Sequence, residues 1–240
     1  MQQESGQKHD VSCATIDDCA FIAQGTLNAE RGHLNYGMWD FMFNGGITSD
    51  NKISDEMIMK CLQKSVETIE SSILFYKNFF IARSTTTGES VGTLSVWNSP
   101  VSLHSTIDSM KDIMQSILGW NEEQYNESKK RLNFLLDASG WKDVPEEIFD
   151  NTLYIETMYV CRSHRGQNIA SSLLDVCINE AKKPKYDASR IFLMCAVGND
   201  KAKKLYEKHG LSVVAYHNHA DTYEALGISG FHIMTMDLEK

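Results

Sequence analysis

Residues 159–174 read YVCRSHRGQNIASSLL and decide the fold. A strand ends near Val160, and a short loop leads into a helix that begins at Ile169. The first turn of a helix has unpaired N–H groups and the positive end of the helix dipole, which together bind phosphate oxygens. Arg165 adds a fixed positive charge. Small side chains that allow close approach come from Gly166, Ala170, Ser171 and Ser172. The segment predicts a pyrophosphate site; an ordinary strand–loop–helix joint is the alternative.

A second informative segment, NDKAKKLYEKHGL, spans residues 199–211. Asn199 follows a predicted strand, where its amide can hydrogen-bond a ligand between strands or simply cap the helix. Tyr206 lies two turns into that helix, so its hydroxyl can reach the mouth of a cleft between two central strands. The alternative for Tyr206 is a half-buried core tyrosine.

The rest of the chain predicts alternating strands and helices. Strands are expected at 10–14, 78–84, 90–97, 153–160, 190–197, 211–217 and 230–238. Helices are expected at 16–30, from Ser49 or Ser54 to 72, and at 105–118, 122–136, 169–183 and about 200–210. Residues 31–47 and the HNHAD segment at 217–221 are interpreted as loops. We expect a disordered tail over 1–9 and a single domain over 10–240, with 100–150 as a helical insertion.

Composition narrows the class of protein. The chain has 240 residues, a formal net charge of −9 and six cysteines without CxxC spacing. This negative charge argues against nucleic-acid binding and favours a cationic acceptor; the alternative is that it only keeps the protein soluble. The cysteine spacing gives no support for a metal site. The sequence contains no run of about 18 apolar residues, so no membrane span is expected. The polar N-terminus does not resemble a signal peptide. We expect a cytoplasmic or nuclear protein, either a monomer or a homodimer.

The order strand, RGxxIA, helix, strand, NxxAxxLYxxxGL resembles the GNAT superfamily of N-acetyltransferases over about residues 153–238. The loop of that family is usually written Q/R-x-x-G-x-G/A, and here it reads Arg165 to Ala170. Asn168 stands where the family usually has glycine, and asparagine is a non-glycine residue that tolerates a left-handed backbone. The insertion resembles the layout of insect arylalkylamine acetyltransferases. The resemblance implies an α/β fold with a mixed, mostly antiparallel sheet flanked by helices, and a helical insertion between the third and fourth strands.

The resemblance further implies acetyl-CoA as cofactor and direct attack of a primary amine in a ternary complex. Tyr206 would protonate the leaving thiolate, and Glu156, or else Glu30, would accept the amine proton. Backbone N–H groups around Met158 and Val160 would polarise the thioester. The implied cofactor-binding residues are Met158, Tyr159, Val160, Arg165, Gly166, Gln167, Asn168, Ile169, Ala170, Ser171, Asn199 and Tyr206.

The acceptor is expected to be a small arylalkylamine or a polyamine, held by residues 31–47 and the insertion. Trp39, Phe41, Trp120 and Tyr125 are candidate walls beside Glu30, because aromatic rings suit a cation; plain core packing is the alternative. Two other functions stay open. One is a non-catalytic acyl-CoA-binding module. The other is a protein-lysine acetyltransferase, which a long insertion over the cleft disfavours.

Overall fold

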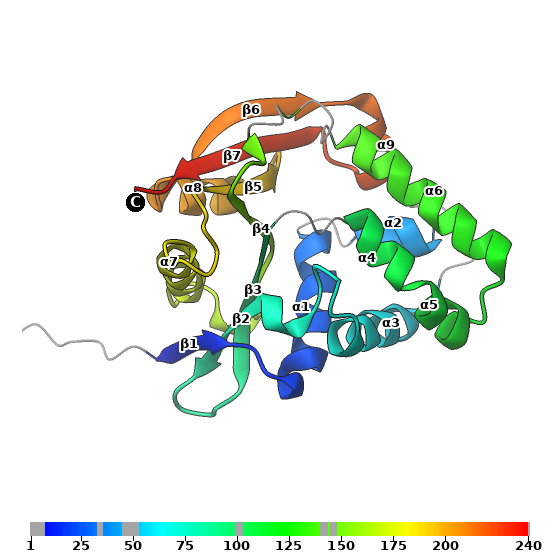
Figure 1. The fold of residues 1–240 in the computed structure, drawn as a ribbon, viewed down its shortest axis with the longest axis horizontal. Coiled ribbons are helices and arrows are strands. Elements are labelled where there is room, and N and C mark those ends of the chain that lie inside the picture. The colour runs from blue at the N-terminus through cyan, green and yellow to red at the C-terminus, as the bar shows by residue number, and fades with distance from the viewer. Residues whose placement is uncertain are drawn as a thin grey trace, which may run out of the picture.

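The computed structural model describes residues 8–32, 36–44, 53–98, 103–139, 144 and 148–239. Its strands form one sheet in the order β1-β2-β3-β4-β5-β7-β6 (Figure 1). Every pairing is antiparallel except that of β4 with β5, which is parallel. The strands are β1 His9–Cys13, β2 Phe79–Ser84, β3 Ser90–Asn98, β4 Thr152–Val160, β5 Arg190–Ala196, β6 Ser212–Asn218 and β7 Gly230–Asp237. The predicted fold class is therefore confirmed.

The helices of the first half and the insertion are α1 Cys19–Arg31, α2 Met38–Asn44, α3 Asp55–Thr68, α4 Leu103–Ser109, α5 Lys111–Leu118 and α6 Glu122–Ala138. The later helices are α7 Ile169–Ala181, α8 Asp200–Lys208 and α9 Ala220–Leu226. Short 3-10 helices occupy Ile16–Asp18, Tyr76–Asn78 and Arg162–His164. Helices α4, α5 and α6 confirm the predicted helical insertion between β3 and β4. None of the described helices is long and apolar enough to cross a membrane.

Two loop predictions are wrong. Residues 31–47 contain α2, whose Trp39, Met42 and Phe43 are buried. Their spacing of three and four residues is that of one helix face, which tertiary packing stabilises. The HNHAD segment contains the start of α9, because His219 accepts a hydrogen bond from the Asp221 N–H at 3.2 Å and so caps that helix. β1 begins at His9, inside the segment predicted as a tail; residues 1–7 lie outside the described part.

Helices cover both faces of the sheet, with α7 on one face and α1 and α3 on the other (Figure 1). Two glycines allow the closest approach to β3. A Cβ at Gly92 would lie 2.8 Å from Ile169 Cγ2 of α7, and a Cβ at Gly25 of α1 would lie 2.6 Å from Thr93 Cγ2. Real Cβ atoms do not come so close, so a larger residue at either position would force a helix away from the sheet. The two helices thus fix the centre of the sheet from opposite sides.

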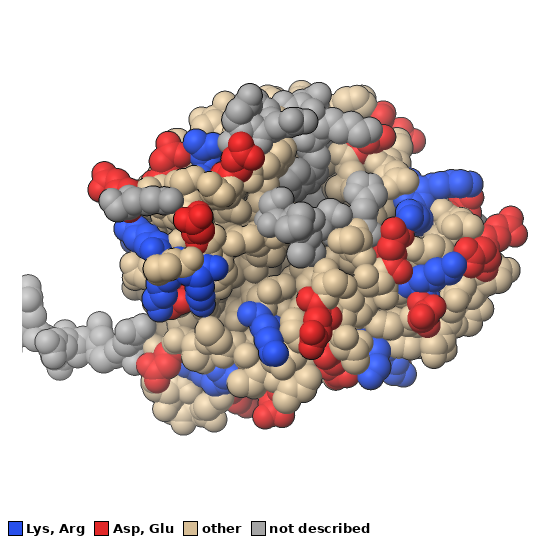
Figure 2. All heavy atoms as spheres, in the orientation of Figure 1, with Lys and Arg blue, Asp and Glu red and all other residues tan. Residues whose placement is uncertain are grey.

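The described surface carries both signs of charge. On the face in Figure 2, lysine and arginine side chains are interspersed with aspartate and glutamate. Several of these side chains form exposed pairs along a single helix, such as Lys60 with Glu56 on α3 at 2.7 Å. Pairs of this kind contribute only about 0.3–0.5 kcal/mol each. The fold therefore depends mainly on the apolar packing beneath them.

Candidate active site

The two central strands separate at their C-terminal ends (Figure 1). β4 pairs with β5 only as far as Tyr154 and Phe192. Beyond that point β4 continues to Val160 along β3, and β5 continues to Ala196 along β7. Among the described residues, each strand therefore has one edge without a strand partner, with N–H and C=O groups available to a ligand. A cavity of about 150 Å³ lies at this opening.

A β-bulge in β4 sets the direction of Glu156. Between two successive pairings, Leu94 with Met158 and Val96 with Ile155, β3 advances by two residues and β4 by three. The extra residue on β4 bends the strand and changes the side-chain alternation. The Thr157 N–H donates to the Ser95 hydroxyl at 2.8 Å, which satisfies a backbone group that the bulge removes from the ladder. Neither Ser95 nor the bulge was predicted, because the alternation in the sequence carries no sign of an extra residue.

The bulge brings Glu156 into the same cavity as Glu30, from the end of α1. Burial, followed by the nearby charge of Glu156, raises the pKa of Glu30 from 4.5 to about 8. Burial raises the pKa of Glu156 to about 7. The nearby Trp97 indole lowers the pKa of Glu156 and so offsets part of this rise. The buried indole N–H nevertheless lacks a partner with hydrogen-bond geometry. The structure thus joins the two carboxylates that the sequence offered as alternatives. A carboxylate that titrates near neutral pH is suited to accept a proton.

A second cavity, of about 110 Å³, adjoins the first and shares both carboxylates with it. Its other walls are apolar apart from Ser139. They come from α2, α6, the central strands and α9, and include Met38, Leu135, Leu136, Phe192, Met194, Leu226 and Phe231. The C-terminal end of α6 is tied down by its Ala138 carbonyl, which accepts from the Thr222 hydroxyl and from His217 Nε2. The insertion therefore forms one wall of this cavity.

Tyr206, Asn199 and Met158 line the first cavity together with the carboxylates. Burial, followed by the nearby Cys195 thiol, raises the pKa of the Tyr206 phenol well above its usual range. The phenol is therefore protonated across the physiological pH range and can serve as a proton donor. Asn199 caps α8 by accepting from the Ala202 N–H at 3.4 Å. Of the two roles predicted for Asn199, the structure shows the capping of α8, at a position that also lines the cavity.

The loop before α7 is exposed from Arg165 to Asn168. Gly166 has φ +78°, and nothing lies within 4 Å of where its Cβ would stand. Asn168 is left-handed at φ 60° and ψ 12°, and its side chain makes no capping hydrogen bond. Asn168 thus adopts the left-handed backbone that asparagine tolerates, and its side chain leaves the first N–H groups of α7 uncapped. Arg165 Nε donates to the Val160 carbonyl at 3.2 Å, which joins the loop to the end of β4.

Comparison with known proteins agrees with this geometry. Residues 134–211 match the sequence model of the acetyltransferase (GNAT) family. The chain has the GNAT fold. No curated protein sequence matches it. An N-acetyltransferase from Staphylococcus aureus Mu50 has 19% identity and a TM-score of 0.58, over 95% of this chain and 100% of that one. The mosquito arylalkylamine N-acetyltransferase like 5b has 12% identity and a TM-score of 0.56, over 96% and 100%.

A third solved structure is yncA from Salmonella typhimurium, which contains its cofactor acetyl-CoA. It has 13% identity and a TM-score of 0.53, over 97% of this chain and 95% of that one. Identities this low show the fold alone. Together with the family match, the GNAT fold supports an acetyltransferase that uses acetyl-CoA, and it leaves the acceptor undetermined.

The aromatic residues expected at the acceptor lie elsewhere in this GNAT fold. Trp39 is buried in the core at 1% exposure. The Phe41 ring packs against Phe134 at 6.0 Å, and Trp120 packs against Phe43 at 5.7 Å between ring centroids. None of these residues, nor Tyr125, is among the described residues that line the two cavities. The alternative of core packing fits Trp39. The apolar part of the described cavity walls consists of aliphatic, methionine and phenylalanine side chains, among them Phe192 and Phe231.

The remaining predicted cofactor residues lie on β4 and at the start of α7. Tyr159 turns its ring toward Phe21 of α1, at 6.2 Å between centroids, and does not line the described cavity. The Ile169 side chain is buried against Gly92. Gln167 is exposed, and Ala170 and Ser171 are partly exposed in the first turn of α7. Among the described residues, no group of three or more His, Cys, Asp or Glu side chains is arranged to hold a metal ion.

Proposed function

We propose that this protein transfers the acetyl group of acetyl-CoA to the primary amine of a small apolar molecule, in a ternary complex. The observation that carries the proposal is one cavity between the separated ends of β4 and β5. It contains two carboxylates with raised pKa values, Glu30 and Glu156, and the protonated phenol of Tyr206. A proton acceptor and a proton donor are the two groups that amine acetylation by a thioester requires.

The first turn of α7 is the proposed holder of the pyrophosphate. Its N–H groups, the positive φ of Gly166 and the absence of a side-chain cap from Asn168 leave room for phosphate oxygens beside Arg165. The open edge of β4, with the backbone of Met158 and Val160, can pair with the amides of the pantetheine arm. Acetyl-CoA, when bound, supplies the activated acyl group. The chain aligns that group with the amine, and such alignment lowers the barrier.

Glu156 is the proposed base. A primary amine has a pKa near 10 and must lose a proton before it attacks. Burial raises the pKa of both carboxylates toward neutral pH, where a carboxylate can take up a proton. Glu156 lies on β4 itself, on whose open edge the thioester is proposed to lie. Glu156 therefore accepts the amine proton, directly or through a water molecule. Tyr206 then donates its proton to the leaving sulfur.

The second cavity supports an acceptor with an apolar tail. If the ammonium group of an acceptor lies beside Glu30 and Glu156, the remainder of the acceptor molecule points toward the walls formed by Leu135, Phe192 and Leu226. A second ammonium group, as in a polyamine, would be buried there without a counter-charge, which is costly. A cavity of about 110 Å³ suits a short chain or a single ring better than a peptide. The proposal therefore favours a small apolar monoamine over a polyamine or a lysine peptide.

Turnover across acceptor classes tests the proposal. Release of CoA is measured with 2-phenylethylamine, spermidine and a lysine peptide at matched concentration, and binding is followed by thermal shift with acetyl-CoA, CoA and ATP. We expect turnover with 2-phenylethylamine and stabilisation by both CoA forms but not by ATP; at a ligand concentration of 100 Kd the stabilisation is about 2.7 kcal/mol. Turnover with the peptide alone would contradict the acceptor. Stabilisation without turnover on any amine would indicate a binding module.

A further inference from the structure

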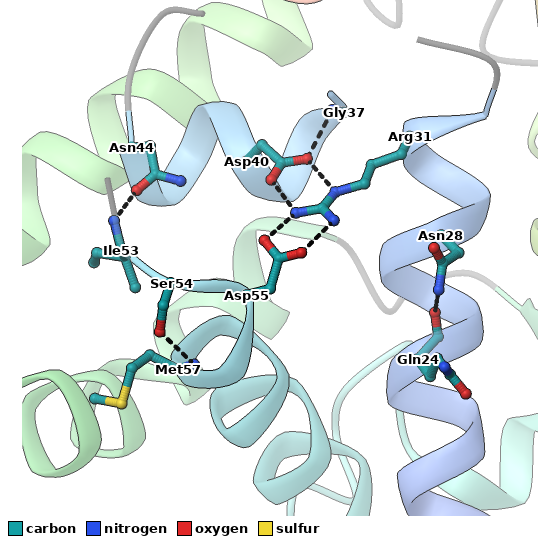
Figure 3. A network of polar contacts seen from close by, with 10 residues as sticks. All are labelled: Gln24, Asn28, Arg31, Gly37, Asp40, Asn44, Ile53, Ser54, Asp55 and Met57. Carbon is teal, nitrogen blue, oxygen red and sulfur yellow. Dashed lines mark hydrogen bonds and ion pairs between the residues drawn. The ribbon is translucent and has the colours of Figure 1, made fainter. Parts of the chain in front are cut away.

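Three helix ends meet at the Arg31 guanidinium (Figure 3). Arg31 is the last residue of α1, Asp40 lies in the first turn of α2, and Asp55 is the first residue of α3. A cation at a helix C-terminus and anions at helix N-termini each oppose the local end charge of the helix dipole favourably. The ion pairs therefore also stabilise the three helix ends that make them.

Arg31 donates two hydrogen bonds to each of the two aspartates. Its Nε donates to Asp40 Oδ2 at 2.9 Å and its Nη2 to Asp40 Oδ1 at 2.6 Å. Its Nη1 donates to Asp55 Oδ2 at 2.8 Å and its Nη2 to Asp55 Oδ1 at 2.7 Å. The Arg31 and Asp40 side chains are only 17% and 7% exposed, whereas Asp55 is 68% exposed. Paired contacts of this kind fix an orientation as well as a distance.

This cluster forms part of one wall of the larger cavity, because Arg31 itself lines that cavity. Glu30 precedes Arg31, and both Glu30 and Met38 line the two cavities, with Gly37 lining the larger one. The Gly37 N–H donates to Asp40 Oδ2 at 2.9 Å (Figure 3). Gly37 also stands against the end of α1, because a Cβ there would be 2.5 Å from the Glu30 carbonyl carbon. The position of Glu30 and Met38 is thus set by the contacts of Arg31 and Asp40.

We propose that Arg31 is a positioning residue for the amine acceptor, an inference that rests on the proposed function. Arg31 acts through Asp40 and Asp55 to hold the end of α1 against the start of α2. That arrangement keeps the Glu30 carboxylate and the Met38 side chain in place around the amine. The cofactor loop before α7 lies on the other side of the sheet from α1 and takes no part in the cluster. Although Arg31 shares the larger cavity with Met158 and Tyr206, the pyrophosphate corner is remote from it, so the Arg31 cluster should affect the affinity for the amine more than the affinity for acetyl-CoA.

The test compares Arg31→Lys and Asp55→Asn with a matched control, Arg83→Lys. Lysine keeps the charge of Arg31 but cannot hold two carboxylates in paired contacts. Asp55→Asn removes one exposed partner and spares the buried Asp40, so this variant tests the inference even if Arg31→Lys folds poorly. Arg83 lies on β2 and pairs with the buried Asp18 of the first 3-10 helix, and neither residue lines either cavity. The control therefore makes the same arginine-to-lysine change in a comparable ion pair without touching the acceptor wall.

Two readouts are taken on each variant: KM for 2-phenylethylamine and for acetyl-CoA, and the calorimetric Kd of 2-phenylethylamine for the CoA-bound protein. We expect Arg31→Lys to raise the amine KM and Kd about tenfold and to leave the acetyl-CoA KM within about twofold, as for a displaced positioning group. Asp55→Asn should shift the same way by about threefold, and Arg83→Lys should leave both KM values unchanged.

The outcomes separate the inference from the proposed function. Wild-type protein that binds the amine without acetylating it would contradict the proposed function, while the Kd values would still test Arg31. Amine Kd values in Arg31→Lys and Asp55→Asn equal to that of Arg83→Lys would overturn the inference, as would a wild-type protein that does not bind the amine. A rise in acetyl-CoA KM equal to the rise in amine KM would overturn it too, because a general loosening of the fold would then explain both.

Discussion

Replacing Glu156 with glutamine should lower acetyltransferase activity. At high pH it should also raise the free energy of unfolding relative to that of the wild type. Burial raises the pKa of Glu156 from 4.5 to about 7. The folded protein therefore keeps this proton over a pH range in which the unfolded chain has released it. The stability from this group is complete below pH 4.5 and is lost as the pH rises through about 7. At 1.36 kcal/mol per pKa unit, the loss is about 3 kcal/mol.

Glutamine does not titrate, so the Glu156→Gln protein should escape this loss. Urea unfolding from about pH 5 to about pH 9 should show the variant gaining up to about 3 kcal/mol relative to wild type. The variant also removes the charge that helps to raise the pKa of Glu30, so that carboxyl should titrate at a lower pH. Over the same pH range, kcat/KM of the wild type should rise through about pH 7, and that of the variant should be at least about 100-fold lower.

Glu30→Gln is the matched comparison, because it removes the other carboxylate of the same cavity. Parallel stability curves for wild type and Glu156→Gln would refute the argument from burial. Full activity in Glu156→Gln with a large loss in Glu30→Gln would transfer the role of base to Glu30. Full activity in both variants would refute the carboxylate mechanism altogether.

Three further predictions concern single residues. Tyr206→Phe should lower kcat by roughly 100-fold with little change in the KM for acetyl-CoA, because the ring is kept and only the proton donor is lost; an unchanged kcat in steady-state assays would refute that role. Gly92→Val should lower the free energy of unfolding by about 2 kcal/mol and Tm by roughly 6 °C, because its side chain would meet Ile169; calorimetry showing no change in Tm would refute this packing. Asn168→Gly should change stability by less than about 0.5 kcal/mol and lower the calorimetric Kd for CoA, since it removes a side chain at the proposed phosphate corner; a higher Kd would show that Asn168 contacts the cofactor.

Except for the short helix α9, most of the second half of the fold could be predicted from the sequence. Its elements have strong local signals, such as Pro184 just beyond the end of α7 and Asn199 as the cap of α8. Such signals act over a few residues and survive in any packing context. Helix α2 was missed because it is short and lies in a segment rich in glycine and asparagine. Tertiary contacts of Trp39 and Met42, not local propensity, stabilise it.

The candidate site could be predicted only in part, for a related reason. Glu156, Glu30 and Tyr206 could be named from the sequence, but their meeting in one cavity depends on the bulge at Thr157 and on the end of α1. Both are set by contacts between residues far apart in the chain. Trp39, Phe41 and Trp120, the aromatic residues named for the acceptor, do not line the described cavities, whose walls depend on where α6 and α9 pack. Chain spacing does not reveal such packing.

The places where this chain departs from good packing lie together, and that is the strongest physical argument for the site. Two partly buried carboxylates face one cavity, and each is costly to ionise there. The Trp97 N–H beside Glu156 is buried without a partner of hydrogen-bond geometry, and β4 carries a bulge at the same point. Each feature lowers stability or regularity, and a protein under selection for stability alone would replace a partly buried glutamate with an apolar residue. Their coincidence at the opening between β4 and β5 is explained if the carboxylates must take up a proton there.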